Sequence, residues 1–134
     1  MNFQKWTEKS IEAIGLAQNL AQEKSNSQIE QEHLLLSLID QENGLISEII
    51  KGLGVNISEM KNWLSDKIGR LSTVSGASQV YMAGDLNAAL VEAEKQAKSM
   101  QDEYVSVEHI LLALLQRPNR VLIEGFKLFN ISKD

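Results

Sequence analysis

The chain has 134 residues and a mass of 15.0 kDa, which is enough for one domain with a hydrophobic core and too little for a complete ATP-driven motor. It contains no cysteine, which excludes disulfides, thiolate zinc sites and a cysteine nucleophile. The net charge of −5, the lack of a long apolar run and the lack of a signal peptide argue against nucleic acid and membranes as partners, and a cytoplasmic location is expected.

In the first half of the chain, apolar residues recur with a period near 3.6, which predicts amphipathic helices. Thr7 is a suitable N-cap for the first of them, and Asn43 for a short third helix that glycines end. Asn56 and Glu59 have the spacing of a capping box, which predicts the start of a fourth helix. The four predicted helices span residues 7–23, 31–40, 43–52 and 56–71.

Residues 72–84 are small and polar, with no sustained helical period, so we interpret them as a linker. The helical pattern then resumes. A fifth helix includes Ala88 to Ala97, a sixth includes Ile110 to Leu115, and Pro118 with Asn119 opens a short seventh. The apolar runs at 34–39 and 110–115 are expected to be core, because a bundle of this size needs them inside.

An internal repeat appears when the chain is shifted by 76 residues. The identical pairs include Ala13/Ala89, Ala17/Ala93, Glu32/Glu108, His33/His109, Leu35/Leu111, Leu38/Leu114 and Asn43/Asn119. We therefore predict an all-α fold of two tandem four-helix repeats related by a pseudo-twofold axis. Together, repeat 1 (1–71), the linker (72–84) and repeat 2 (85–134) form a single domain.

The same register predicts a truncated eighth helix. Val55 and Asn56, which open the fourth helix, map onto Ile131 and Ser132, and the sequence ends two residues later. The eighth helix thus has a cap and no body, and we expect the chain to be cut from a longer protein.

The motifs that carry chemistry are few. A phosphate-binding loop and a dinucleotide-binding glycine motif are absent, and no catalytic group is expected. Both histidines lie in Glu-His pairs, at 32–33 and 108–109, and neither has a second histidine four residues on, so no metal site is expected. The two glutamates leave two interpretations open. They stabilise the first turns of their helices, or they accept cationic or N–H donors from a bound chain.

Taken together, these motifs resemble the Clp N-terminal domain of AAA+ chaperones. The resemblance rests on Glu-His-Leu-Leu-Leu-Ser-Leu at 32–38 and Glu-His-Ile-Leu-Leu-Ala-Leu at 108–114, and it covers almost the whole chain. The ClpB disaggregase branch is the most similar, on Thr7-Glu8-Lys9-Ser10, on residues 71–76 and 79–81, and on residues 102–109.

This resemblance implies a non-catalytic domain that captures exposed segments of unfolded or aggregated proteins for threading by downstream ATPase modules. It assigns substrate contacts to Thr7, Asp102 and Glu108, and to an apolar groove along the fifth helix that includes Leu86 and Leu90. Glu92 and Gln96 on that helix depart from some relatives. No cofactor is implied for the domain, whereas ATP, Mg²⁺ and a homo-hexamer are implied for the parent protein.

The alternative within the same family is the N-domain of a ClpA- or ClpC-type unfoldase that serves a protease. Such a domain receives adaptor proteins, and in the ClpC branch the glutamate of each Glu-His pair binds phosphoarginine. Glu32 and Glu108 are the matching residues. The Gly-Thr that usually precedes both pairs in ClpC is replaced by Glu30-Gln31 and Ser106-Val107.

Overall fold

The computed structural model describes residues 2–75 and 79–132. Within these ranges the regular secondary structure is helical apart from two short strands, which confirms the predicted all-α class. The helices are α1 (Glu8–Glu23), α2 (Gln31–Asp40), α3 (Leu45–Gly52), α4 (Ile57–Gly69), α5 (Gly84–Ser99), α6 (Val107–Gln116) and α7 (Arg120–Leu128). The strands are β1 (Gln28–Ile29) and β2 (Tyr81–Met82). A body for the predicted eighth helix would fall outside the described residues.

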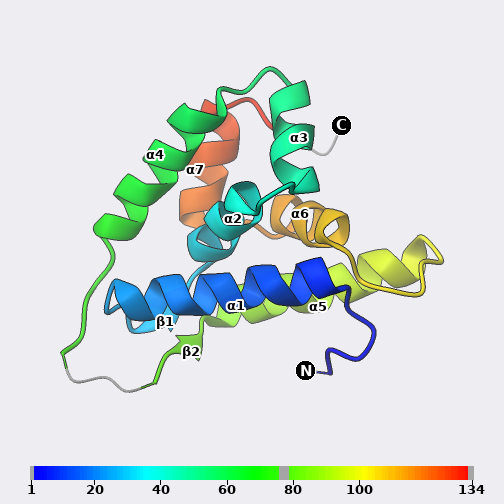
Figure 1. Cartoon of the computed structure of the whole chain (residues 1–134), viewed down its shortest axis with the longest axis horizontal. Helices are drawn as coiled ribbons and strands as arrows, with labels where there is room; N and C mark the ends of the chain where they lie inside the picture. Colours follow the sequence, from blue (N-terminus) through cyan, green and yellow to red (C-terminus); the bar gives the residue numbers. More distant parts are fainter. Residues whose placement is uncertain (1, 76–78, 133–134) are drawn as a thin grey trace.

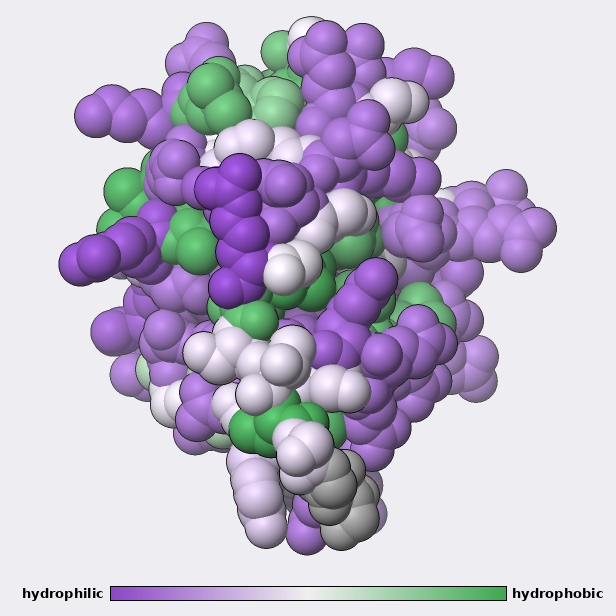
Figure 2. Space-filling model, turned by 90° about the vertical axis from the view of Figure 1, so that its left-hand side faces the viewer, coloured by the Kyte–Doolittle hydropathy of each residue, from purple (hydrophilic) through white to green (hydrophobic). Residues whose placement is uncertain are grey.

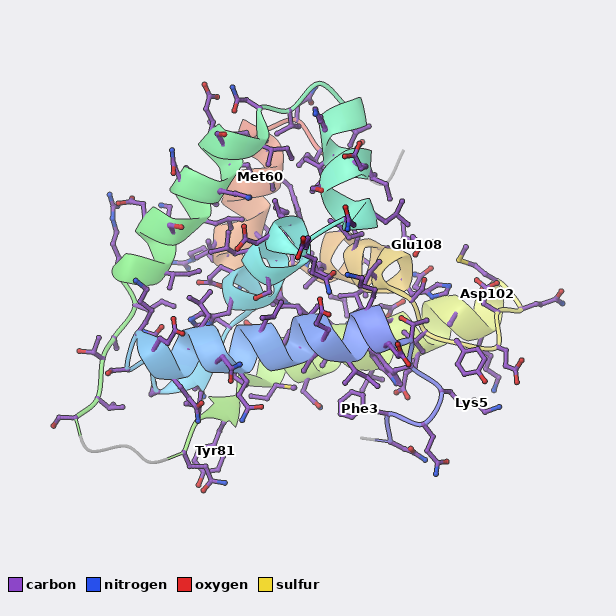
Figure 3. All side chains as sticks on the ribbon, in the orientation of Figure 1. Phe3, Lys5, Met60, Tyr81, Asp102 and Glu108 are labelled. Carbon is purple, nitrogen blue, oxygen red and sulfur yellow. The ribbon has the colours of Figure 1, made fainter. Side chains whose placement is uncertain are left out.

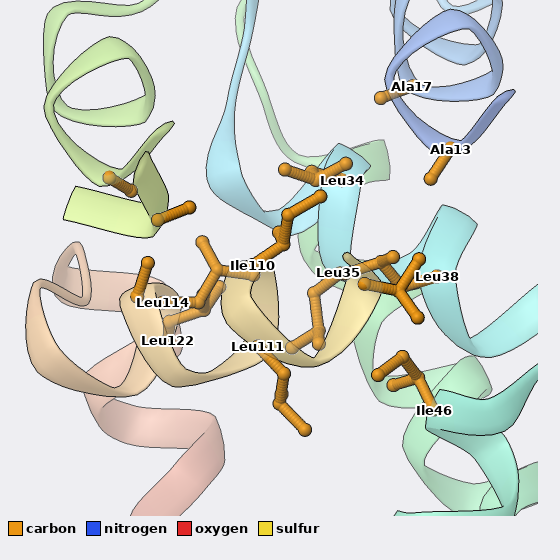
Figure 4. Close-up of a cluster of buried hydrophobic side chains, with 14 of the residues drawn as sticks. Ala13, Ala17, Leu34, Leu35, Leu38, Ile46, Ile110, Leu111, Leu114 and Leu122 are labelled. Carbon is orange, nitrogen blue, oxygen red and sulfur yellow. The ribbon is translucent and has the colours of Figure 1, made fainter. Parts of the chain in front are cut away.

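The two leucine-rich helices, α2 and α6, lie at the centre of the fold. Helix α1 packs against α2, and α5 packs against α6, while α3, α4 and α7 cover the opposite side (Figure 1). The side chains of Leu34, Leu38, Ile110 and Leu114 are almost fully buried and gather between these layers (Figure 4). The runs predicted as core are therefore core, and their burial supplies the main stabilisation of the fold.

Strand pairing relates the two repeats by the predicted pseudo-twofold axis. β1 and β2 pair in parallel, with Ile29 opposite Met82. Trp6 and Val105 form an isolated parallel bridge. Adding 76 to Trp6 and subtracting 76 from Val105 gives Met82 and Ile29, so the two pairs are equivalent. The segment before the first helix of each repeat thus pairs with the other repeat, and the repeats are interlocked.

Left-handed backbone positions follow the same register. Ser25 (φ 55°) and Gln101 (φ 59°) come directly after α1 and α5, and they are 76 residues apart. The symmetry breaks at Asn43, which is itself left-handed (φ 55°), whereas Asn119 caps α7 by accepting the N–H of Leu122. The predicted cap of α3 by Asn43 is therefore wrong.

Gly44 takes the N-cap position of α3 instead. A Cβ at Gly44 would lie 3.0 Å from the backbone oxygen and from the Cβ of Gln41, so this turn favours a residue without a side chain.

The interpretation of residues 72–84 as a plain linker is corrected by the structure. Thr73 forms an antiparallel bridge with Asn26, and the N–H of Val74 donates to the carbonyl of Ser25 at 2.8 Å. β2 occupies residues 81–82, and α5 already begins at Gly84. The linker residues that the structure describes are thus attached to repeat 1 at both ends. Residues 76–78 lie outside the described part.

Candidate functional site

His33 joins the turn before α2 to the start of that helix. Its Nδ1 accepts the backbone N–H of Glu30 at 2.8 Å, so its Nε2 carries the proton and donates to Oδ1 of Asn26 at 2.9 Å. Burial of the ring lowers the pKa of His33 to about 4, against the smaller opposing effect of the bond to Glu30. His33 is consequently a neutral structural residue that fixes the turn.

His109 makes the same arrangement at the start of α6. Its Nδ1 accepts the backbone N–H of Ser106 at 2.8 Å, and its Nε2 donates to Oδ2 of Asp102, also at 2.8 Å. Asp102 is the 76-residue equivalent of Asn26, so a carboxylate replaces an amide. Both histidines serve the fold, and the described residues contain no group of three side chains that could hold a metal ion.

At the start of α2 the space beside the helix is closed by Gln31. Its Nε2 donates to the carbonyls of Asp85 at 3.0 Å and Arg117 at 2.9 Å. Its Oε1 accepts the N–H of Asn119 at 2.8 Å. Gln31 is fully buried, and the hydrogen bonds of its side chain all reach the other repeat.

Glu32 is buried in the same closed end. Only 1% of the residue is exposed, and Nδ2 of Asn119 donates to its Oε1 at 2.8 Å. In this conformation Glu32 does not present a carboxylate to a bound chain or to phosphoarginine, because the oxygen is paired and covered. Nearby, burial and then the charges of Glu32 and Asp85 raise the pKa of Glu30.

The start of α6 is open, in contrast. Val107 stands where Gln31 stands in repeat 1, and a cavity of about 270 Å³ lies beside it. We call this the Glu108 cavity. It is lined by Thr7, Lys9, Gln41, Asn43, Leu45, Ser106, Val107 and Glu108. Glu108 is exposed at its edge, as is 46% of Leu45.

Thr7 reaches the Glu108 cavity from the start of α1. As predicted, it is the N-cap: its Oγ1 accepts the N–H of Ser10 at 3.2 Å, and its own N–H donates to the carbonyl of Val105 at 3.0 Å. The structure thus brings Thr7 and Glu108 together. Asp102 is not part of the cavity lining and lies beyond His109 in the α5–α6 loop (Figure 3).

Leu86 and Leu90 are not surface residues. Each is 1% exposed, because they lie on the face of α5 that packs into the core. The expected apolar groove on α5 cannot use their side chains in this conformation. The outer face of α5 carries Glu92 instead, which is joined to Arg117 at 3.0 Å.

Sequence reasoning missed the roles of Val107, Gln41 and Leu45 in the cavity. The difference between Gln31 and Val107 was visible in the repeat alignment, and it is the signal that could have identified the open end. A further cavity of about 520 Å³ lies between α3, α4 and the end of α2, and its lining includes neither Thr7 nor Glu108. In the described part of the chain, none of the helices has the length and apolar character of a membrane span.

Comparison with known proteins identifies what the chain is similar to. Residues 5–127 match the model of the Clp repeat (R) N-terminal domain. The chaperone protein ClpB of Nitratidesulfovibrio vulgaris is 37% identical over the whole chain, which spans 16% of the length of that relative. The Hsp104 N-terminal domain from Candida albicans superposes with a TM-score of 0.85 at 22% identity, covering 96% of this chain and 84% of that one. A solved complex of a ClpV N-domain with a VipB peptide gives a TM-score of 0.76 at 20% identity, covering 96% and 81%.

Proposed function

Because the chain belongs to the family of the Clp repeat N-terminal domain, we propose that it is the substrate-binding N-terminal domain of a ClpB-type protein disaggregase. In this role the domain is non-catalytic. It captures exposed segments of unfolded or aggregated polypeptides in the cytoplasm, and AAA+ modules of a hexameric parent protein, supplied with ATP and Mg²⁺, thread them.

The observation that carries this proposal is the Glu108 cavity. Glu108 offers a carboxylate to a peptide N–H or a cationic side chain, and Leu45 offers apolar surface beside it, above the buried side chain of Val107. Thr7 fixes the opposite wall through its cap. The polar group can bind the backbone of an extended segment, and the small apolar surface can contact one of its side chains. Such contacts do not require a particular sequence.

A volume of about 270 Å³ accommodates one or two side chains, so the isolated domain should bind weakly. We expect dissociation constants on the order of 10 μM to 1 mM, with avidity from several domains in the assembled parent protein.

The second candidate is an adaptor-binding N-domain of a ClpA- or ClpC-type unfoldase. The ClpV N-domain in complex with a VipB peptide favours recognition of defined peptides by this fold. In this chain only Glu108 of the two Glu-His glutamates is accessible, because Glu32 is buried. A phosphoarginine group would thus find one carboxylate rather than a symmetric pair.

The test is a titration of the chain with a labelled, permanently unfolded protein such as carboxymethylated α-lactalbumin, followed by fluorescence anisotropy. Leu45→Glu and Glu108→Lys each change an exposed residue of the cavity and should weaken binding about tenfold, or 1.4 kcal/mol. Leu53→Glu is the matched control, because Leu53 is 51% exposed at the C-cap of α3, at the other end of the helix from Leu45, and does not line the cavity.

Equal binding by all three variants and the wild type would contradict the assignment of the cavity. Saturable binding of free phosphoarginine that Glu108→Lys abolishes would favour the ClpC-type alternative.

A further inference from the structure

A second groove lies on the outer face of repeat 1, between α1 and α2. Its floor consists of Leu16, Leu20 and Leu36, of which Leu16 is 40% exposed and the other two are partly buried. Asn19, Ser37, Glu23 and Asp40 complete the lining, and the volume is about 270 Å³. We call this the α1/α2 groove.

The equivalent place in repeat 2 carries polar side chains that bond to one another. Glu92 and Gln96 replace Leu16 and Leu20 in the 76-residue register. Nε of Arg117 donates to Oε1 of Glu92 at 3.0 Å, and Nε2 of Gln96 donates to Oε2 at 3.1 Å. These bonds lower the pKa of Glu92. Arg117 therefore lies against the outer face of α5, with its head on Glu92.

Repeat 1 lacks this internal occupant. Gln41 is the equivalent of Arg117, and its Nε2 donates to the carbonyl of Lys9 and to Oε1 of Glu12, both at 2.9 Å. It is directed toward the start of α1 and away from the leucines. The apolar floor of the α1/α2 groove is thus left uncovered by the part of the chain that the structure describes.

The charge around the groove is acidic. Glu23 and Asp40 are the charged residues of the lining, which includes neither lysine nor arginine. Asp40 is exposed and pairs with Lys61 at 2.8 Å. Glu23, on the last turn of α1, has no ion-pair partner among the described residues. The left-hand side of the molecule as drawn in Figure 1 is mostly hydrophilic, with small separate apolar areas (Figure 2).

We propose that the α1/α2 groove binds a polypeptide segment in which an aliphatic side chain is followed or preceded, about three residues away, by arginine or lysine. The aliphatic group covers Leu16 and Leu20, and the cation pairs with Glu23. Leu16 and Glu23 are seven residues apart on α1, which is about 10 Å along the axis. An extended chain covers about 10 Å in three residues. The proposal rests on the proposed function, since it names a class of substrate segment for the same domain.

The internal precedent supports the choice of a basic occupant. Arg117 shows that this surface of the fold accommodates an arginine side chain against the outer face of the helix, with its head on a carboxylate. In repeat 1 a leucine replaces Glu92 on the helix face, and the carboxylate is that of Glu23 at the edge of the groove. The cation must therefore come from an occupant that also covers the leucines.

The experiment uses a fluorescein-labelled 12-residue peptide of serine and glycine that contains one leucine and one arginine three positions apart. Binding to the full chain is measured by anisotropy. The double variant Leu16→Glu/Leu20→Gln gives repeat 1 the residues of repeat 2 and should weaken binding at least about tenfold. Ile11→Glu is the matched control, since Ile11 is 46% exposed on the same helix and outside the groove. Thermal unfolding of each variant checks that it is folded.

The outcomes separate this proposal from the proposed function. Unchanged peptide binding by the double variant, with binding of unfolded protein still lost in Leu45→Glu, would overturn the groove and leave the Glu108 cavity intact. Absence of unfolded-protein binding by the wild-type chain would overturn the proposed function itself. Equal binding of a peptide with glutamate in place of arginine would overturn the basic occupant, and with it the proposal.

Discussion

At the start of α2, Gln31 makes three hydrogen bonds to the other repeat, whereas at the start of α6 the equivalent Val107 lies beside a cavity. The backbones around the two positions are alike, since His33 and His109 fix both turns in the same way. What differs is one side chain and its partners.

This comparison shows how a duplicated fold comes to have one closed end and one open end. The repeated histidines and strand pairs keep the frame, and they leave the residue before each glutamate free to change. A long amide in repeat 1 closes the space and covers Glu32, whereas a short apolar side chain in repeat 2 leaves Glu108 accessible.

The largest expected effect comes from Gln31→Val, which gives repeat 1 the residue of repeat 2. The carbonyls of Asp85 and Arg117 and the N–H of Asn119 lose their partner, and a cavity opens. We expect the free energy of unfolding to fall by about 4 kcal/mol, measured by urea denaturation.

Gln28→Val is the matched control for this change. Gln28 is exposed on β1, so the same substitution there should alter stability by less than about 0.5 kcal/mol. Equal effects of the two substitutions would show that the bonds of Gln31 are not what closes the end of α2.

The next effect concerns the histidines. The pKa of His33 is lowered to about 4, so between pH 6.5 and 4 the unfolded chain binds a proton that the folded chain does not. The free energy of unfolding therefore decreases as the pH is lowered through that window, by up to about 3 kcal/mol. Asn26→Asp places a carboxylate opposite Nε2 of His33, as Asp102 does for His109 in repeat 2. This carboxylate should raise the pKa of His33, so that less stability is lost on acidification than in the wild type.

Two-dimensional ¹⁵N NMR of the imidazole rings measures this pKa directly. The raised pKa of Glu30 acts in the opposite sense, and Asn26→Asp adds a titratable carboxyl and removes the amide that donates to the carbonyl of Ser72, so the ring pKa and not the change in stability isolates His33. A His33 ring that titrates near 6.5 in the wild type would contradict its burial as a neutral group.

The smallest expected effect distinguishes the two glutamates. Glu32→Gln places an amide opposite Nδ2 of Asn119 inside the closed end and should cost about 1 kcal/mol. Glu108→Gln changes an exposed side chain and should leave stability within about 0.5 kcal/mol. Chemical denaturation at neutral pH measures both, and a larger loss for Glu108→Gln would reverse the comparison.

Much of the fold was predictable because its signals are local. Thr7, Asn56 and Asn119 accept the N–H groups that their positions predicted, and the apolar period located the core helices. The cap of α3 was predicted wrongly because Asn43 aligns with Asn119 in the repeat but has a different backbone conformation. Asparagine also adopts left-handed backbone, which local sequence does not distinguish from a cap.

The site was less predictable because it depends on contacts between the repeats. Leu86 and Leu90 share one buried face of α5 with Ala89, Ala93 and Ala97, so the helical period itself indicates that they face inward, and the expected groove rested on the family resemblance alone. The burial of Glu32 depends on Asn119, 87 residues later. Such pairings between polar residues leave no periodic signal, and only the three-dimensional structure brings them together.

The crossed strand pairs set a limit on how the domain can be divided. Because Trp6 pairs with Val105 and β2 pairs with β1, neither half owns a complete set of backbone partners. Each half supplies backbone partners to the other, as in a domain-swapped dimer. The segment before α1 is thus tied by backbone hydrogen bonds to the loop before α6, which joins the wall that carries Thr7 to the wall that carries Glu108.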